Sequence, residues 1–141
     1  MWKIGYLILC EEIITTSDQK SIIPLVGLNP ISIPGNFSFR IAFSLFSTDK
    51  NPSRHNIIRV VLKDPSGKTV KDTNEIKFEI PEPEITNGRA VKAGEADLGF
   101  NNIVLPVEGT YQVVVTVNGE TKTLEVPVAK MTPLNEGDSV E

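Results

Sequence analysis

The sequence has very little of the chemistry on which most enzymes and metal sites depend. Its 141 residues include one cysteine and one histidine, which excludes a disulfide framework and any zinc site built from several Cys or His ligands. Aromatic residues make up only 6% of the chain, and no apolar run approaches the roughly 20 residues of a membrane helix. With 14 basic and 18 acidic residues the formal net charge is −4, which argues against generic nucleic-acid binding. What is present is the composition of one soluble globular domain.

The first ten residues look like a short signal peptide or a lipoprotein box, but they lack its requirements. The apolar stretch is short, Leu9 precedes Cys10 where processing needs a small residue, and the acids Glu11 and Glu12 follow at once. We interpret Ile4–Cys10 as a buried strand, apolar on both parities as a central strand is. The absence of a signal predicts a cytoplasmic location with a reduced thiol.

Alternating apolar and polar residues recur along the chain, and no segment has a sustained helical period. The alternation is clearest over Phe37–Leu45. Asp64–Gly67 has the residues of a type I turn, and Asn118-Gly119 predicts a type I′ hairpin. Pro24 predicts an edge strand or a bulge. The expected strands cover residues 4–14, 21–28, 37–45, 57–63, 68–71, 75–80, 96–105, 111–117 and 124–128.

These elements predict an all-β fold, a single antiparallel β-sandwich of about eight strands with immunoglobulin-like topology. A small β-barrel is the alternative. The sandwich should span residues 1–130, followed by an acidic, flexible tail over 131–141. Residues 48–56 are expected to form a polar loop, and residues 81–95 a long loop that is either functional or disordered.

Six short phrases, spread over most of residues 4–130, resemble a bacterial and phage family of small β-sandwich proteins, domain of unknown function 6941. They are Leu7-Ile8-Leu9-Cys10-Glu11, Pro24-Leu25-Val26-Gly27-Leu28, Asp64-Pro65-Ser66-Gly67-Lys68, Phe78-Glu79-Ile80-Pro81, Glu108-Gly109-Thr110-Tyr111 and Val117-Asn118-Gly119-Glu120. The family carries no established activity to transfer. The resemblance therefore implies a fold and a bacterial or phage source.

No set of side chains assembles into a catalytic or metal site on the sequence. His55 lies in a polar loop without a nucleophile elbow beside it. Cys10, on a two-sided apolar strand, is expected to be a buried hydrophobe. Glu11 and Glu12 face opposite ways in a strand, and Glu82 and Glu84 lie in a proline-rich loop. The aspartates are scattered, without the spacing of a calcium loop. We therefore predict no catalytic residue, no metal site and no cofactor.

The charge is unevenly distributed along the chain. Between Arg40 and Lys77 there are eight basic and four acidic residues, a balance of +4, so the remainder carries −8. Arg59 and Lys63 share a strand parity with apolar Ile57, which predicts a mixed apolar and basic face able to contact a partner. The candidate partner surface combines that face with the long loop: Arg54, Arg59, Lys63, Glu82, Glu84 and Arg89.

The leading hypothesis is a non-enzymatic protein that acts through protein–protein contacts, with a partner of unknown identity. A narrower version is a phage accessory factor that inhibits a host protein or a nucleotide signal. The alternatives are a small-molecule or carbohydrate-binding module, a hydrolase built on carboxylates, and a virion or envelope structural subunit. No membrane and no generic nucleic-acid binding are expected, and the chain is a candidate homo-oligomer.

Overall fold

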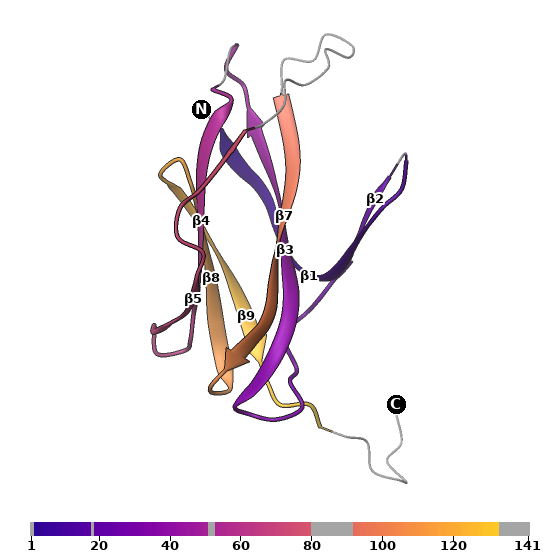
Figure 1. Cartoon of the computed structure of the whole chain (residues 1–141), viewed down its shortest axis with the longest axis vertical. Helices are drawn as coiled ribbons and strands as arrows, with labels where there is room; N and C mark the ends of the chain where they lie inside the picture. The colour runs from indigo at the N-terminus through magenta and orange to yellow at the C-terminus, as the bar shows by residue number, and fades with distance from the viewer. Residues whose placement is uncertain (1, 18, 51–52, 80–91, 133–141) are drawn as a thin grey trace.

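A computed structural model describes residues 2–17, 19–50, 53–79 and 92–132, and in these ranges the chain forms nine strands and no helix. Sheet A has the order β2-β1-β3-β7, and sheet B the order β5-β4-β8-β9, with β6 also paired to β4 (Figure 1). All paired strands are antiparallel. The strands are β1 (Lys3–Thr15), β2 (Lys20–Pro24), β3 (Gly35–Ser47), β4 (His55–Lys63), β5 (Thr69–Asp72), β6 (Ile76–Glu79), β7 (Lys92–Leu105), β8 (Gly109–Val117) and β9 (Glu120–Val128).

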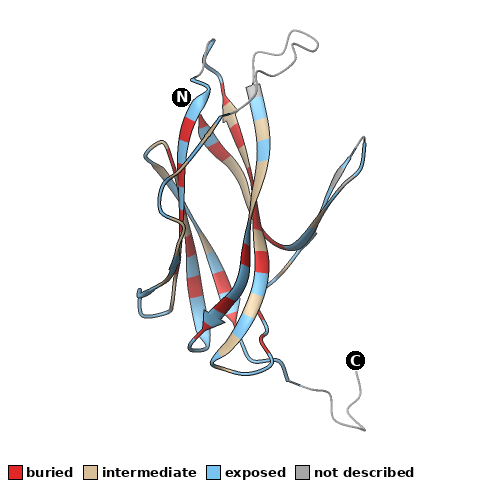
Figure 2. Ribbon diagram, viewed as in Figure 1, coloured by how far each residue is buried: buried red, intermediate tan, exposed pale blue. Residues whose placement is uncertain are grey.

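The core lies between the two sheets, and alternate residues of each long strand point into it (Figure 2). The predicted period of two on β3, β4 and β8 is confirmed. The alternating apolar side chains that these three strands bury in the shared core are Phe39, Ile41, Phe43, Leu45, Ile58, Val60, Leu62, Tyr111, Val113, Val115 and Val117. Ala42 is buried as well, on the other face of β3. Two layers that share one apolar core make a sandwich. Immunoglobulin-like topology stays a prediction, with which this strand order is consistent.

A bulge in β1 explains why core residues of this strand fall on both parities of the sequence. Ile4 pairs with Leu45, and Leu7 pairs with Phe43. Between these two pairs, β1 therefore contains one residue more than β3. Side chains on either side of the bulge therefore point into the same core although their parities differ. Gly5 is required there, because a Cβ atom would lie 2.3 Å from the Ser44 hydroxyl oxygen.

The predicted turns and the edge strand are confirmed. Asn118 and Gly119 have φ values of 49° and 85°, the positive pair that a type I′ hairpin needs. In the turn that begins at Asp64, the amide of Gly67 donates to the Asp64 carbonyl at 2.9 Å. Strand β2 is the edge of sheet A and ends at Pro24, and a bulge interrupts its pairing with β1.

Several predicted boundaries are wrong, among them the strand expected over residues 21–28, which ends at Pro24, and the strand expected over 124–128, which begins at Glu120. Lys92–Glu95, expected to close a long loop, belong to β7, because they pair with the last residues of β3. His55, expected in a loop, is the first residue of β4 and pairs with Glu79. In these last two places the strand is extended by a distant partner that local composition does not reveal. The rest of the predicted 81–95 loop, and most of the predicted tail, lie outside the described residues.

A seam of parallel backbone pairing joins the segment after β2 to the end of β9. The Leu28 amide donates to the Pro127 carbonyl at 2.9 Å, and the Ala129 amide donates back to Leu28 at 3.1 Å. The Met131 amide bonds to the Pro30 carbonyl at 2.8 Å. Leu28 is fully buried beside this seam, which therefore covers part of the outer edge of sheet B. Within the described ranges no helix could cross a membrane.

Candidate interaction surfaces

The predicted partner surface lies partly on the outer face of β4. Arg59 and Lys63 point away from the core on the same side as Ile57 and Val61, so the mixed apolar and basic face predicted from the sequence exists. Arg54 is exposed immediately before β4. The three loop members of the predicted surface, Glu82, Glu84 and Arg89, lie outside the described residues.

The charge of Arg59 is largely balanced by an acid from β5. Its Nε donates to Oδ1 of Asp72 at 3.0 Å, and its Nη2 donates to Oδ2 at 2.5 Å. This bidentate bond, helped by the Asn74 amide, lowers the pKa of Asp72 to about 2. The same pairing raises the pKa of Arg59. The basic stretch of the sequence is therefore less basic in space than along the chain.

An apolar strip lies across the outer face of sheet B. Val61 of β4 is directly opposite Val114 of β8, and both are half-buried. Ile57, farther along β4, is 40% exposed. Lys63 and Lys77 stand at the two ends of this strip, since Lys77 pairs with Ile57 and Lys63 is two residues beyond Val61. Along β4, Arg59 lies between Ile57 and Val61 on this face, so the strip is apolar in two separate parts, with a lysine at each end.

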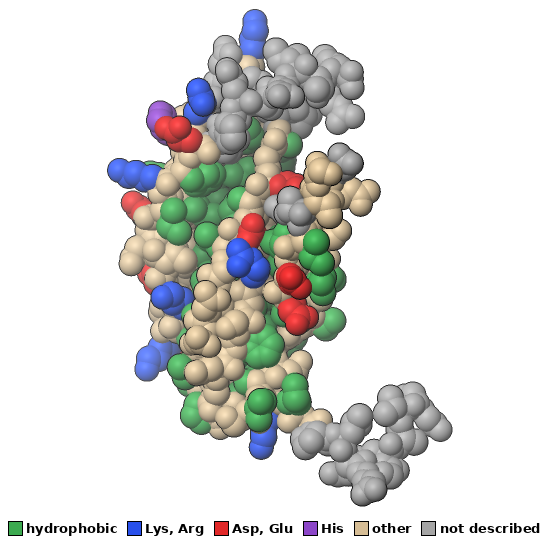
Figure 3. Space-filling view, turned by 45° about the vertical axis from the view of Figure 1, so that its right-hand side comes forward, with side chains coloured by type: hydrophobic (Ala, Val, Ile, Leu, Met, Phe, Trp, Pro, Cys, Tyr) green, Lys and Arg blue, Asp and Glu red, His purple; other side chains and the backbone are tan. Residues whose placement is uncertain are grey.

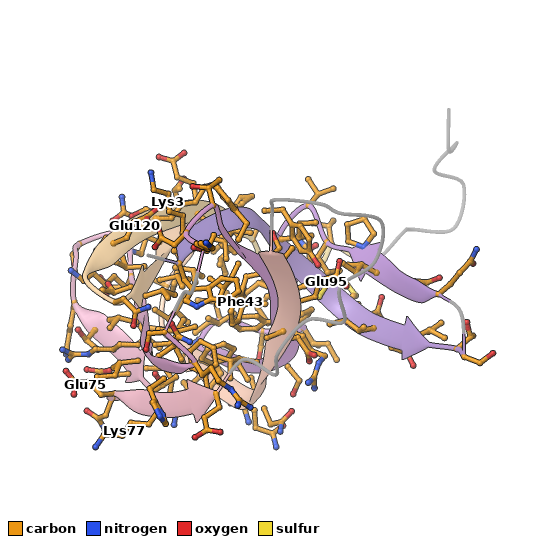
Figure 4. The ribbon with its side chains drawn as sticks, turned by 90° about the horizontal axis from the view of Figure 1, so that it is seen from above. Lys3, Phe43, Glu75, Lys77, Glu95 and Glu120 are labelled. Atoms are coloured by element: carbon orange, nitrogen blue, oxygen red, sulfur yellow. The ribbon has the colours of Figure 1, made fainter. Side chains whose placement is uncertain are left out.

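A pocket of about 610 Å³ opens beside the first residues of β4, at the end of the strip that Ile57 occupies. Its wall includes a hydrogen-bonded pair of amides, because the Asn118 Nδ2 donates to Oδ1 of buried Asn56 at 2.6 Å. His55 Nδ1 lies 3.3 Å from Glu79 Oε1 at its mouth. Figure 4 shows Glu75 and Lys77 at this side of the sandwich. The lining residues are His55, Asn56, Ile57, Lys77, Phe78, Glu79 and Asn118.

The candidate catalytic residues of the sequence do not come together. Cys10 is fully buried, as predicted, and its Sγ lies 3.4 Å from the Arg40 carbonyl oxygen. His55 is exposed at the start of β4. The carboxylate of Asp64 accepts bonds from Ser66 and Lys68 in its own turn, which lowers its pKa. Within the described ranges no three His, Cys, Asp or Glu side chains converge where a metal ion could bind.

On the outer face of sheet A, Arg40 of β3 forms an ion pair with Asp97 of β7. Arg40 Nε donates to Asp97 Oδ2 at 2.9 Å, and its Nη2 bonds to the same oxygen. Gly99 gives the guanidinium room, since a Cβ atom would lie 2.7 Å from Arg40 Nη1. Beside this pair, desolvation and then the charge of Glu95 raise the pKa of Tyr6 to about 12.

Beyond this face, β1 and β2 continue as a projecting hairpin, residues 11–24, which we call the arm. The last pair of β1 with β3 is Cys10 with Arg40, and from Glu12 onward β1 pairs with β2 alone. Figures 1 and 4 show the arm directed away from the sandwich. Figure 3 shows apolar side chains along it, with acidic side chains beside them. The sequence predicts two covered faces only for Ile4–Cys10, and it does not reveal the arm.

Comparison with known proteins places the chain in a family without a known activity. A family model described as a family of unknown function, DUF6941, matches residues 5–128. No curated protein matches. One solved structure, the Pseudomonas fluorescens alkylpurine DNA glycosylase AlkC bound to DNA containing an abasic site analog, is 17% identical with a TM-score of 0.46. The match covers 90% of this chain and only 30% of the glycosylase. The chain therefore belongs to the family of unknown function DUF6941.

Proposed function

We propose that this protein is a non-enzymatic binding protein that holds another protein on the outer face of sheet B. The observation that carries the proposal is the apolar strip of Ile57, Val61 and Val114, which ends in a pocket. Protein interfaces concentrate their binding energy where an apolar or aromatic side chain fills such a pocket. Beside the strip, Thr116 and Thr121 bond to each other at 3.1 Å, and Arg59 bonds to Asp72, so these polar groups already have partners within the sheet.

The charges around the strip indicate the chemistry of the partner. Lys63 and Lys77 flank it at its two ends, whereas Arg59 is already occupied by Asp72. A partner segment with apolar side chains in its centre and carboxylates at its ends would complement this arrangement. The lysines would then act mainly on the rate of association and on its salt dependence.

The non-enzymatic part of the proposal is supported by where the reactive groups are used. The thiol of Cys10 is buried in the sheet. The two carboxylates with lowered pKa values, Asp64 and Asp72, are engaged by a turn and by Arg59. Each of these three groups therefore has a structural role in the fold.

The test compares two charge-matched double variants in affinity purification from the native host. Ile57→Glu with Lys63→Glu alters the strip, and Val26→Glu with Lys68→Glu alters exposed positions away from it. We expect the first variant to lose at least about tenfold of the partner captured by the wild type, and the second to retain it. Equal capture by both variants, with unchanged melting temperatures, would sink the proposal, as would specific capture of DNA instead of protein.

A second candidate function is binding of a small molecule, such as a carbohydrate, in the pocket. The specific observation is that the pocket lining combines the aromatic ring of Phe78 with the polar side chains of His55, Glu79 and Asn118. A thermal-shift screen of sugars and metabolites tests it. A ligand that raises the melting temperature of the wild type but not of Phe78→Ala would favour this candidate. The roles of phage accessory factor and of virion or envelope subunit are finer versions of protein binding, and the identity of a captured partner separates them.

A further inference from the structure

The arm carries apolar side chains that the sandwich does not use. Four isoleucines lie on it, on both faces, and none belongs to the core or packs against it. Ile14 and Ile23 are 44% and 39% exposed, and Ile13 pairs with Ile22 on the opposite face. A hairpin of two strands is marginally stable alone in water. A surface of this kind gains stability when another surface covers it.

The backbone of β2 offers hydrogen-bonding groups along its free edge. The Leu25 amide donates to the Leu9 carbonyl at 2.9 Å, so Leu25 and the alternate residues Ile23 and Ser21 face β1. The groups of Lys20 and Ile22 then point away from β1, because neighbouring residues of a strand face opposite edges. Pro24 has the same outward direction, and it offers a carbonyl without an amide hydrogen.

The strand edges of sheet B are partly covered or short, whereas β7, the other edge of sheet A, is long. The seam covers part of the β9 edge, and β5 and β6 have four residues each. These are recognised means of preventing strands from adding to a sheet edge. The β2 edge, carried on a projecting arm between two apolar faces, is open to pairing.

We propose that β2 pairs antiparallel with β2 of a second copy of this chain, with Ile22 on the two-fold axis. Each Ile22 amide would donate to the Ile22 carbonyl of the other copy, and each Lys20 amide to the Pro24 carbonyl. Pro24 then lies opposite Lys20 of the other copy. Because Pro24 has no amide hydrogen, only the Lys20 carbonyl at each end of the pairing lacks an amide partner. The two four-stranded sheets A would join into one continuous sheet.

The register explains why the occupant is a second copy. On one face, Ile13 and Ile22 of the two copies form a continuous row of isoleucines across the axis. On the other face, Ser21 of one copy stands opposite Ile23 of the other, which brings the exposed Ile23 and Ile14 side chains of both copies close together. Glu12, which pairs with Ile23 on the outside, stays at the outer rim, so no like charges face each other. Such self-complementarity closes a two-fold dimer.

The geometry of the arm leaves room for this dimer. Figure 4 shows the arm extending well past the sandwich on the side away from Glu75 and Lys77. The outer face of sheet B, on which the proposed function rests, remains accessible. The two proposals therefore fail independently, because one concerns self-association and the other a foreign partner.

Analytical ultracentrifugation of the full chain over a concentration series tests the dimer. We expect a species of twice 15.5 kDa for the wild type. Ile22→Lys places two charges against each other at the axis and should weaken dimerisation by about 100-fold or more. Val26→Lys is the matched control, because Val26 is 94% exposed just beyond β2, and it should dimerise normally. A wild type that stays monomeric at every concentration, or an Ile22→Lys variant that dimerises normally, would overturn the proposal.

Oxidative cross-linking tests the register. Residues opposite each other in a hydrogen-bonded antiparallel pair have Cα atoms about 5.5 Å apart, a separation that a disulfide spans. Ile22→Cys should cross-link two chains rapidly, whereas Ile23→Cys, opposite Ser21 in the proposed register, should not. The wild type, whose native Cys10 is buried, gives the background level of cross-linking. Efficient cross-linking of Ile23→Cys with none of Ile22→Cys would refute the two-fold at Ile22. Pairing of β2 with a strand of a different protein, and none with its own copy, would refute the second copy.

Discussion

Tyr111 joins the start of β8 to the turn that precedes it. Its side chain is fully buried, and its hydroxyl donates to the Val107 carbonyl at 2.6 Å and accepts from the Val107 amide at 3.2 Å. A tyrosine that bonds back to the backbone a few residues upstream, at the corner between two sheets, is a recurrent device of β-sandwiches. It satisfies two backbone groups that the turn would otherwise leave without partners.

Tyr111→Phe should lower the free energy of unfolding by about 1–3 kcal/mol. It removes both bonds and leaves the amide and the carbonyl of Val107 without that partner. Urea denaturation measures the change. Thr116→Val on the same strand is the control, because it removes an exposed hydroxyl bond and should change stability by less than about 0.5 kcal/mol. A loss for Tyr111→Phe no larger than that of the control would contradict this role.

Asp72 should make the fold sensitive to acid. Its pKa of about 2 in the folded protein lies below the value near 4 of an unfolded aspartate. The ionised carboxylate therefore stabilises the fold above pH 4, and this contribution is lost as the pH falls from 4 toward 2. Carbon-detected NMR titration of the Asp72 carboxyl group measures the pKa directly. Arg59→Gln should raise that pKa, and a midpoint that stays near 2 in this variant would assign the shift to another cause.

At the scale of elements, the β8–β9 hairpin is fastened to β4 by the side chain of its own turn. Asn118 Oδ1 accepts from the Ile57 amide at 3.0 Å, and Nδ2 donates to Asn56. Asn118 thus has two roles. Its positive φ allows the turn, and its side-chain amide binds the turn to β4. A glycine could perform the first role without the second.

Asn118→Gly should therefore destabilise the protein by about 1–3 kcal/mol although glycine accepts the turn conformation. The side-chain oxygen Oδ1 of buried Asn56 would lose the hydrogen bond that it accepts from Asn118 Nδ2. Gly119→Asn is the comparison for strain in the turn alone, since nothing lies within 4 Å of a Cβ atom there but the φ of +85° strains a side chain, which asparagine tolerates better than most residues. Thermal unfolding followed by circular dichroism compares the two. A larger loss for Gly119→Asn would show that turn strain, and not the clamp, decides stability.

The same scale shows what the sequence could predict. In β3, β4 and β8, apolar and polar residues alternate because one face of each strand is buried. This pattern is local, so these strands and their inward residues can be predicted from the sequence. The bulge at Gly5 and the first residues of β7 depend on which residues of β3 lie opposite, which no local pattern records. The pairing of Arg59 with Asp72 likewise required two strands to meet. The arm could not be predicted from the sequence. A strand with isoleucines on both faces has the same sequence pattern whether it is central in a sheet or projects into solvent.

At the scale of the whole molecule, Trp2 ties the N-terminal strand of sheet A to the chain that enters sheet B. It is 3% exposed, and its Nε1 donates to the Ser53 carbonyl at 2.6 Å. It is the chain's single tryptophan. Its emission therefore reports on contact between the two layers.

Trp2→Ala should cost about 3–5 kcal/mol, because it removes a large side chain from the core. Trp2→Phe keeps an aromatic ring and loses the bond to Ser53, so its cost should be smaller. In the wild type, the tryptophan fluorescence and circular dichroism transitions in urea should coincide. Separate transitions would mean that the end of the core near Trp2 opens before the sheets do.

The seam between Leu28 and Val128 has a consequence for how the chain acquires its structure. It joins segments 100 residues apart, as the bond from Asn29 to Ala129 does, and contacts of such separation slow folding because a long loop must close first. On the ribosome, where synthesis proceeds at about 5–20 residues per second, the seam cannot form until residue 131 has emerged. The Leu28 segment must therefore wait without its partner for about 5–20 s, the time needed to synthesise the roughly 100 residues between the two segments. That interval is when the nascent chain is most exposed to wrong pairing.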